Sequence, residues 1–288
     1  MTNAEFSEVC KRRDKCIDYL KLQGYNVIFV GLYGSQNYNM QTENSDYDFK
    51  AIVVPTLDDI IRNKQPTSKT IDCHDIFNGQ VDVKDIRWMV NEWKKGAVNF
   101  MEILFTACIY INSNFSEMNW FIKHREEIAH ANNESTLKAM IGMITNKLNN
   151  LYKQLPCQIA EIEQYGYSGK QLCHALRLNN MIKYYHDLTY AELLNPEVIS
   201  STNSNFNLQD KRCKQFEIYR DIKTHKLSFS NDDIKELTDM IIVESDECYN
   251  AYKQNGFTVN TEIFNQMDEM AYSIIRKVIK DEILKEDN

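Results

Sequence analysis

The chain has 288 residues, 43% of them hydrophobic, and a formal net charge of −8 at pH 7. This length favours two domains with ordinary cores. No apolar run reaches the roughly 18–20 residues of a membrane helix, and the N-terminus lacks the apolar core of a signal peptide, so we expect a cytoplasmic protein without membrane partners. The acidic balance argues against a protein that coats nucleic acid by charge alone, although it is compatible with a local basic groove.

The eight cysteines are scattered along the chain without any C-x-x-C pair. This spacing indicates neither a zinc ribbon nor a disulfide framework. We therefore expect reduced cysteines that mostly fill small core positions.

The first part of the chain predicts a helix followed by short strands. Apolar residues at helical spacing indicate a helix that ends near Leu22, and Gly24 stands where a residue with positive φ is expected. Three strands follow, over residues 26–34, 49–55 and 80–86. Two helices, over residues 85–96 and 99–106, are expected to close this module.

After about residue 113 the pattern becomes helical. Apolar stripes run through residues 137–151, 234–241 and 267–278, and Ser230 with Asp233 forms a capping box before the second. The sequence therefore predicts an α+β protein, with an N-terminal module over 1–112 that contains a small mixed sheet and a mainly α-helical module over 113–288.

Carboxylates gather at the start of the second strand and in the third. Residues two apart on a strand share a side, so Asp46 and Asp48 would lie on one face within roughly 7 Å of each other. In the third strand, Asp82 and Lys84 alternate with apolar residues, so Asp82 could join them if the two strands pair. Three carboxylates could hold two Mg²⁺ ions about 4 Å apart, whereas an isolated D-x-D is more often only a strand start with exposed acids.

Gly34 and Ser35 end the first strand and give this D-x-D a context. Glycine lets the backbone approach a phosphate closely, and the serine hydroxyl adds a hydrogen bond. The residues that follow could open a short helix whose free N–H groups face an anion. The segment is not a P-loop, because no G-x-x-x-x-G-K-[ST] is present.

The segment "GSQNYNMQTENSDYD", residues 34–48, resembles the signature of DNA polymerase β-type nucleotidyltransferases. Within this superfamily, it resembles the branch of predicted nucleotidyltransferases that includes the RNA-ligase-associated polymerase-β-like (RNA repair) proteins. The pattern of that branch is G-S-x-x-x-G-x-x-x-x-x-S-D-x-D. Ser45 matches in register, and Asn39 stands where the pattern has its second glycine. Asparagine adopts a positive φ more readily than most residues.

This resemblance implies a polymerase-β-type catalytic domain over residues 1–112, completed by the helical domain. It implies that Asp46, Asp48 and Asp82 are catalytic and hold two Mg²⁺ ions, which Mn²⁺ could replace. It also implies nucleotide binding by Gly34, Ser35 and Ser45.

A second motif lies on a helix that Ser168 can cap. Lys170, His174 and Arg177 fall within about 60° of one another around the helix axis. A plain amphipathic helix with a hydrated polar side is the simpler interpretation. The resembling branch, however, carries a Lys-x-x-x-His-x-x-Arg helix, which implies that Lys170 and Arg177 bind a triphosphate and that His174 binds a phosphate or the acceptor.

Together, these expectations predict a Mg²⁺-dependent nucleotidyltransferase. It would move a nucleoside monophosphate from an NTP to an acceptor hydroxyl and release pyrophosphate. The resemblance points to an RNA 3′ end, that of tRNA included, as the acceptor. A protein hydroxyl and a small molecule are the alternative acceptors. Two rival functions are a protein-modifying (NMPylating) toxin or regulator of the same fold and a non-catalytic nucleotide sensor.

Overall fold

The structure is a computed structural model that describes residues 3–38, 40–42, 45–195, 206–227 and 229–286. The chain forms two compact units. The first comprises Met1–Ala131 together with Val259–Asn288, and the second comprises Asn132–Thr258. The predicted α+β class is confirmed. Within the described residues, no helix is both long and apolar enough to cross a membrane.

The first unit contains a five-stranded sheet and its covering helices. Its elements are α1 (Asn3–Leu22), β1 (Asn26–Tyr33), the 3₁₀ turn η1 (Ser35–Tyr38), β2 (Tyr47–Val54), α2 (Leu57–Ile61), β3 (Ser68–Asp72), α3 (His74–Phe77), β4 (Gly79–Asp85), α4 (Ile86–Lys94), α5 (Val98–Met101), η2 (Glu102–Leu104), β5 (Ile109–Ile111), α6 (Glu117–Lys123), α7 (Arg125–Ala129) and α14 (Thr261–Glu286). The predicted end of the first helix at Leu22 is confirmed, and Gly24 has a φ of +81°.

The sheet is mixed, as predicted, with strand order β3-β4-β2-β1-β5. β2 runs parallel to β4, while β1 is antiparallel to β2 and β5, and β3 is antiparallel to β4. The three predicted strands correspond to β1, β2 and β4. Sequence analysis missed β3, whose residues are mostly exposed and polar, and β5, which has only three residues.

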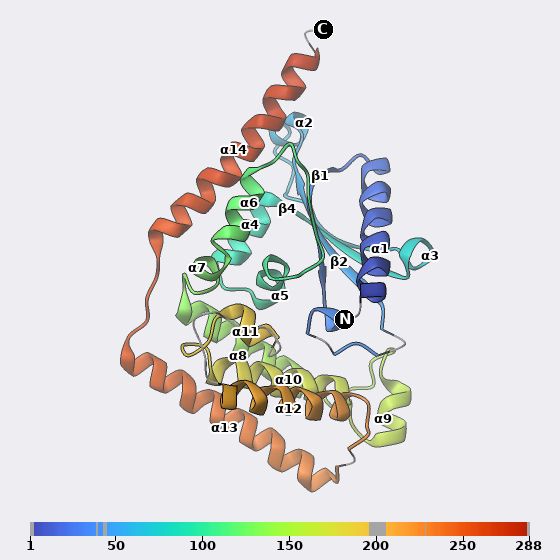
Figure 1. Cartoon of the computed structure of the whole chain (residues 1–288), viewed down its shortest axis with the longest axis vertical. Helices are drawn as coiled ribbons and strands as arrows, with labels where there is room; N and C mark the ends of the chain where they lie inside the picture. The colour runs from blue at the N-terminus through green and yellow to red at the C-terminus, as the bar shows by residue number, and fades with distance from the viewer. Residues whose placement is uncertain (1–2, 39, 43–44, 196–205, 228, 287–288) are drawn as a thin grey trace. The chain divides into compact units, whose positions relative to one another are not determined.

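Helices cover both faces of this sheet (Figure 1). α1 and α3 cover one face, where Ile17 and Leu20 pack with Phe49, Val81 and Val83 in the main core cluster. α4 and α5 lie on the opposite face, to which residues at alternate positions of β2 and β4 point. Lys50, Asp82 and Lys84 of these two strands are therefore buried.

The last helix, α14, belongs to the first unit, so the chain divides differently from the expected 1–112 and 113–288. Its predicted apolar stripe is buried at Met267 and Ile274. α14 packs beside α4 and α6, where the Ser273 hydroxyl donates to Glu117 at 3.1 Å. A stripe of this kind gives no information about which helix it will pack against, and for this reason the sequence did not place it.

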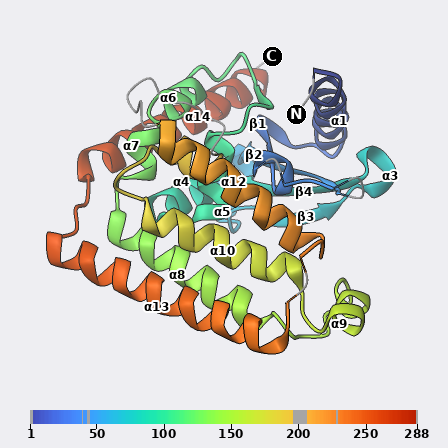
Figure 2. The same cartoon turned by 60° about the horizontal axis from the view of Figure 1, so that its bottom comes forward.

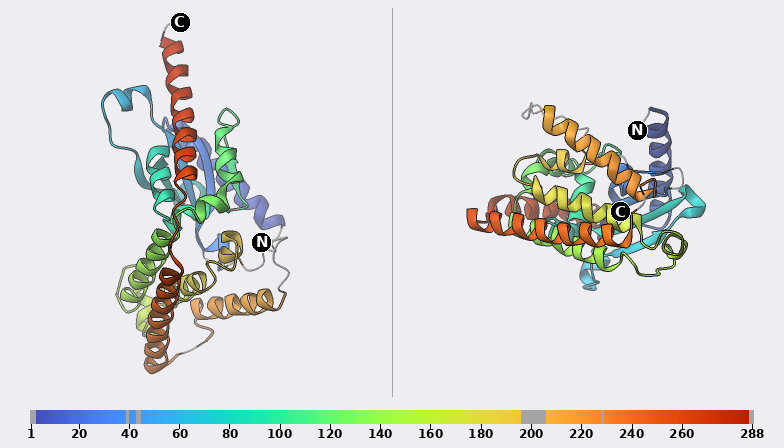
Figure 3. Two further views of the ribbon diagram at one scale, coloured as in Figure 1. Left: turned by 90° about the vertical axis from the view of Figure 1, so that its left-hand side faces the viewer. Right: turned by 90° about the horizontal axis from the view of Figure 1, so that it is seen from below.

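The second unit is entirely helical in its described part. Its helices are α8 (Asn133–Asn149), α9 (Ile159–Tyr165), α10 (Gly169–Lys183), α11 (Tyr190–Leu194), α12 (Phe206–Lys223) and α13 (Asn231–Asn255). α10 has α8, α12 and α13 packed beside it (Figures 2 and 3). Both predicted caps are confirmed: the Ser168 hydroxyl accepts from the Gln171 N–H, and Ser230 forms the capping box with Asp233.

The packing of α14 predicts a position-dependent loss of stability. Ile274→Ala removes a side chain with no exposed surface, so we expect the free energy of unfolding to fall by about 2–5 kcal/mol. Ile283→Ala, on the same helix but 45% exposed, should change it by less than about 1 kcal/mol. Urea unfolding of both variants tests this, and equal losses would contradict the assigned burial.

Candidate functional site

The Gly-Ser loop and the D-x-D segment lie together at one end of β1 and β2. Gly34 has a φ of +84°, and a Cβ added to it would lie 3.2 Å from Oδ2 of Asp48, so both the backbone conformation and the space favour glycine. Ser35 begins η1, as the predicted short helical turn requires. Gln36 Nε2 donates to the carbonyl of Asp46 at 3.3 Å. The loop therefore contacts both aspartates of the D-x-D. Asn39 lies outside the described residues.

The two aspartates differ in their surroundings. Asp48 is the second residue of β2, is half-buried, and pairs across the ladder with Tyr33 of β1. Asp46, predicted on the strand, instead precedes it and is exposed, because the ladder ends where Gly34 turns the chain away. His74 Nε2 lies 3.8 Å from Oδ2 of Asp46. Asp46 is therefore open to solvent, whereas Asp48 is held by the sheet.

Asp82 lies on the strand beside them, as predicted, but in an unexpected environment. β2 and β4 pair in parallel, and their register places Lys50 opposite Asp82. Asp82 is only 6% exposed. Its Oδ2 accepts from Lys50 Nζ at 3.0 Å, and its Oδ1 lies 2.9 Å from Lys84 Nζ and accepts from Thr70 Oγ1 at 3.4 Å. Asp82, which the sequence predicted as a metal ligand, is thus a buried anion between two lysines.

Aromatic rings surround these lysines. The Lys50 ammonium lies 3.9 Å from the ring centroid of Tyr33 and 4.5 Å from that of Phe100, and Lys84 lies 4.6 Å from Trp88. Burial lowers the pKa of Lys50, and Asp82 opposes that shift. Burial and the Asp48 and Asp82 carboxylates raise the pKa of the Tyr33 phenol. Charges on this face of the sheet therefore interact strongly, because little water screens them.

Sequence analysis missed Lys50, although a signal for it was present. Lys50 follows Asp48 by two residues on the same strand, so it shares a face with that carboxylate. Only the pairing of β2 with β4, which the sequence suggested but did not establish, brings it to Asp82.

The three carboxylates do not form one compact ligand set. Among the residues that the structure describes, no group of three or more His, Cys, Asp and Glu side chains could hold a metal ion. Asp46 and Asp48 offer oxygen donors suited to Mg²⁺ beside the Gly-Ser loop. Asp82 fits that role poorly, because both of its oxygens are engaged by ammonium groups.

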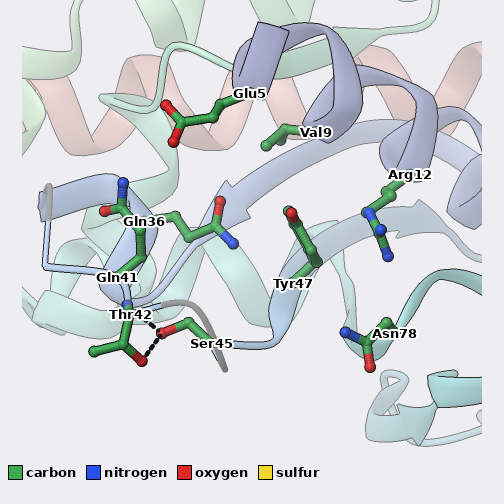
Figure 4. A pocket seen from close by; sticks show the side chains of 9 residues that line it. All are labelled: Glu5, Val9, Arg12, Gln36, Gln41, Thr42, Ser45, Tyr47 and Asn78. Atoms are coloured by element: carbon green, nitrogen blue, oxygen red, sulfur yellow. Dashed lines mark hydrogen bonds between the residues drawn. The ribbon is translucent and has the colours of Figure 1, made fainter. Parts of the chain in front are cut away.

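Ser45, expected to bind nucleotide, contributes to a local turn and to a polar pocket. Its hydroxyl accepts from the backbone N–H of Thr42 at 2.8 Å and lies 3.2 Å from the Thr42 hydroxyl (Figure 4). The pocket has a volume of about 290 Å³ and lies between α1 and the segment that joins η1 to β2. Arg12 of α1 stacks over the Tyr47 ring at 4.2 Å in its wall.

In the second unit, the predicted stripe on α10 is confirmed as one face of a helix but is less hydrated than expected. Lys170 is exposed, His174 is half-buried, and Arg177 is only 2% exposed. Arg177 Nη1 donates toward the sulfur of Met181 at 3.6 Å. A plain amphipathic helix with a hydrated polar side does not describe this face.

Two further lysines from neighbouring helices join this stripe. Burial, followed by Lys170 and Arg177, lowers the pKa of Lys147 on α8. Burial and Lys170 also lower the pKa of Lys223 on α12, while Cys173 opposes that shift. The pKa of His174 lies well below its ordinary value because of burial and these cations. We call Lys147, Lys170, His174, Arg177 and Lys223 the basic cluster.

A close helix contact holds part of the basic cluster together. A Cβ added to Gly169, at the start of α10, would lie 2.4 Å from the backbone oxygen of Ile222 on α12. Glycine therefore lets the two helices approach at the positions next to Lys170 and Lys223. The sequence could not reveal Lys147 and Lys223 as members, because they come from other helices and match no motif.

Comparison with known proteins gives little further information. No protein-family model and no curated protein matches the chain. Among solved structures, the chain is similar to a nucleotidyltransferase-like protein from Exiguobacterium sibiricum 255-15, with 9% identity and a TM-score of 0.29, over 88% of this chain and 74% of that one. Such low values establish neither a common fold nor a common activity.

The electrostatics predict opposite behaviour for two histidines. Hydrogen bonding to Asp72 raises the pKa of His74, whereas burial and the basic cluster lower that of His174. As the pH falls, His74 should therefore take up a proton before His174. Because the unfolded chain protonates His174 near pH 6.5 and the folded chain protonates it only at lower pH, the contribution of His174 should lower the stability of the folded state below about that pH.

Proton NMR titration measures this order directly. His74→Gln and His174→Gln variants would assign the two imidazole signals. A His174 signal that titrates at or above the pH of His74 would contradict the described environment.

Proposed function

We propose that the chain is a Mg²⁺-dependent nucleotidyltransferase that moves a nucleoside monophosphate from an NTP to an acceptor hydroxyl. The observation that carries this proposal is the close approach of the Gly-Ser loop to the D-x-D. A Cβ added to Gly34 would lie only 3.2 Å from Oδ2 of Asp48. A loop without side-chain bulk beside paired carboxylates suits a phosphate group that shares a cation with protein oxygens.

In this proposal the chain binds and orients the triphosphate. The backbone of Gly34 and the hydroxyl of Ser35 contact the β and γ phosphates, and Ser45 holds the loop that leads to the D-x-D. Asp46 and Asp48 hold Mg²⁺, which when bound neutralises phosphate charge. The acceptor hydroxyl oxygen bonds to the α phosphorus and gives up its proton to water, the bond from the α phosphorus to the bridging α–β oxygen breaks, and pyrophosphate leaves.

The basic cluster of the second unit carries positive charge, which suits phosphate groups. As the resemblance implies, Lys170 and Arg177 bind phosphates, and His174, whose pKa is lowered by burial and by the neighbouring cations, donates or accepts a hydrogen bond at a phosphate or at the acceptor. Burial lowers the pKa values of Lys147 and Lys223, and the neighbouring cations lower them further; a bound anion would relieve that repulsion.

We propose an RNA 3′ end as the acceptor. The support is the resemblance of the Gly-Ser and D-x-D segment to RNA-repair-associated proteins, since the charge of −8 gives none. Incubation with α-labelled NTPs, total RNA and lysate protein tests this. Label in RNA supports the proposal, whereas label in protein alone would indicate a protein-modifying enzyme, and consumption of no NTP would favour a nucleotide sensor.

The role of Asp46 generates a direct prediction. Asp46→Asn removes a carboxylate that holds Mg²⁺, so pyrophosphate release should fall by about 100-fold or more. Asp75→Asn, an exposed carboxylate on α3, is the control and should leave the rate unchanged. A coupled pyrophosphate assay at saturating Mg²⁺ measures both. Unchanged release by Asp46→Asn would contradict the assignment.

Lys147 offers a matched test of the basic cluster. Lys147→Met removes a half-buried charge beside Lys170 and Arg177, so the dissociation constant for ATP should rise by about tenfold, which corresponds to ~1.4 kcal/mol. Lys138→Met, on the same helix but exposed and paired with Glu134 at 2.6 Å, should leave it unchanged. Calorimetric titration compares them, and equal affinities would exclude Lys147 from the site.

A further inference from the structure

The ion pairs around Asp82 bear on how many cations the site binds. Lys50, Asp82 and Lys84 are 3%, 6% and 7% exposed. The Lys84 ammonium, which lies 2.9 Å from Asp82, also donates a hydrogen bond to Ser68 Oγ at 2.8 Å. A metal ion bound to Asp82 would have to displace a lysine that aromatic rings enclose, leaving a buried ammonium without its counter-charge. The surroundings of Asp82 therefore disfavour a metal ion.

The position of Lys50 strengthens this point. Lys50 lies two residues from Asp48 on one side of β2 and opposite Asp82 in the parallel ladder. Its ammonium is 3.0 Å from Oδ2 of Asp82, and it lies on the same side of β2 as the Asp48 carboxylate. A positive charge thus lies against one of the carboxylates that a second divalent cation would join, and on the same side of the sheet as the other.

We infer that the Lys50 ammonium stands in for one of the two divalent cations expected at this site, so that the chain binds a single cation, on Asp46 and Asp48. This inference rests on the proposed function. Asp82 then holds Lys50 in place and is not a metal ligand. Lys50 is a positioning residue, whose charge is present before any substrate binds.

Counting bound metal tests the inference without any measurement of activity. The full chain is dialysed to equilibrium against Mn²⁺ and an excess of α,β-methylene ATP, and the excess Mn²⁺ on the protein side is measured per chain. One Mn²⁺ per chain is expected. Two would overturn the inference and leave the proposed function intact, whereas none would overturn the proposed metal dependence itself.

Two variants with one matched control identify Lys50 as the cause. Lys50→Met keeps an unbranched side chain between the rings but frees an oxygen of Asp82, and it should bind a second Mn²⁺. Lys50→Arg keeps the charge and should bind one. Lys69→Met is the control. Lys69 lies on β3 with its ammonium 5.0 Å from the centroid of the Tyr25 ring, and this variant should also bind one Mn²⁺. A folded Lys50→Met that binds one Mn²⁺ would overturn the role of Lys50, and the wild-type count decides the stoichiometry even if this variant does not fold.

Discussion

The buried ion pair between Lys50 and Asp82 constrains the face of the sheet that carries Asp48. It forms only because β2 and β4 are parallel neighbours in one register, and it links the strand that carries the D-x-D to the strand beside it. Replacing one partner of a buried pair leaves an uncompensated charge, at a typical cost of about 3–5 kcal/mol. The pair therefore penalises any shift of β2 relative to β4, while the register of β1 with β2, which pairs Tyr33 with Asp48, places Asp48 beside Gly34.

The two units carry opposite charges at their candidate sites. The first presents Asp46 and Asp48 beside a loop suited to phosphate, and these carboxylates would repel a triphosphate unless a cation lies between them. The second presents the basic cluster, in which burial and neighbouring cations lower the pKa values of Lys147, His174 and Lys223. Each arrangement is electrostatically unfavourable alone: a cation would relieve the first, and an anion would relieve the second. Such polar strain is typical of functional sites.

Local patterns in the sequence predicted most of the individual elements. The alternation in β4, the caps at Ser168 and Ser230 and the positive φ expected at Gly24 are properties of a few adjacent residues, and the structure has all of them. Pairings between distant segments were not predictable in the same way. The return of α14 to the first unit, Lys50 opposite Asp82, and the two outer members of the basic cluster depend on tertiary packing, which a single sequence does not specify.

The most direct test of the account compares transfer of label from α-labelled and γ-labelled ATP to RNA, with Mg²⁺, by the wild-type chain and by Asp48→Ala. The account predicts that the α label enters RNA, that the γ label leaves as pyrophosphate, and that Asp48→Ala transfers neither. Transfer of the γ label to the acceptor, or undiminished α-label transfer by Asp48→Ala, would contradict nucleotidyl transfer at the D-x-D.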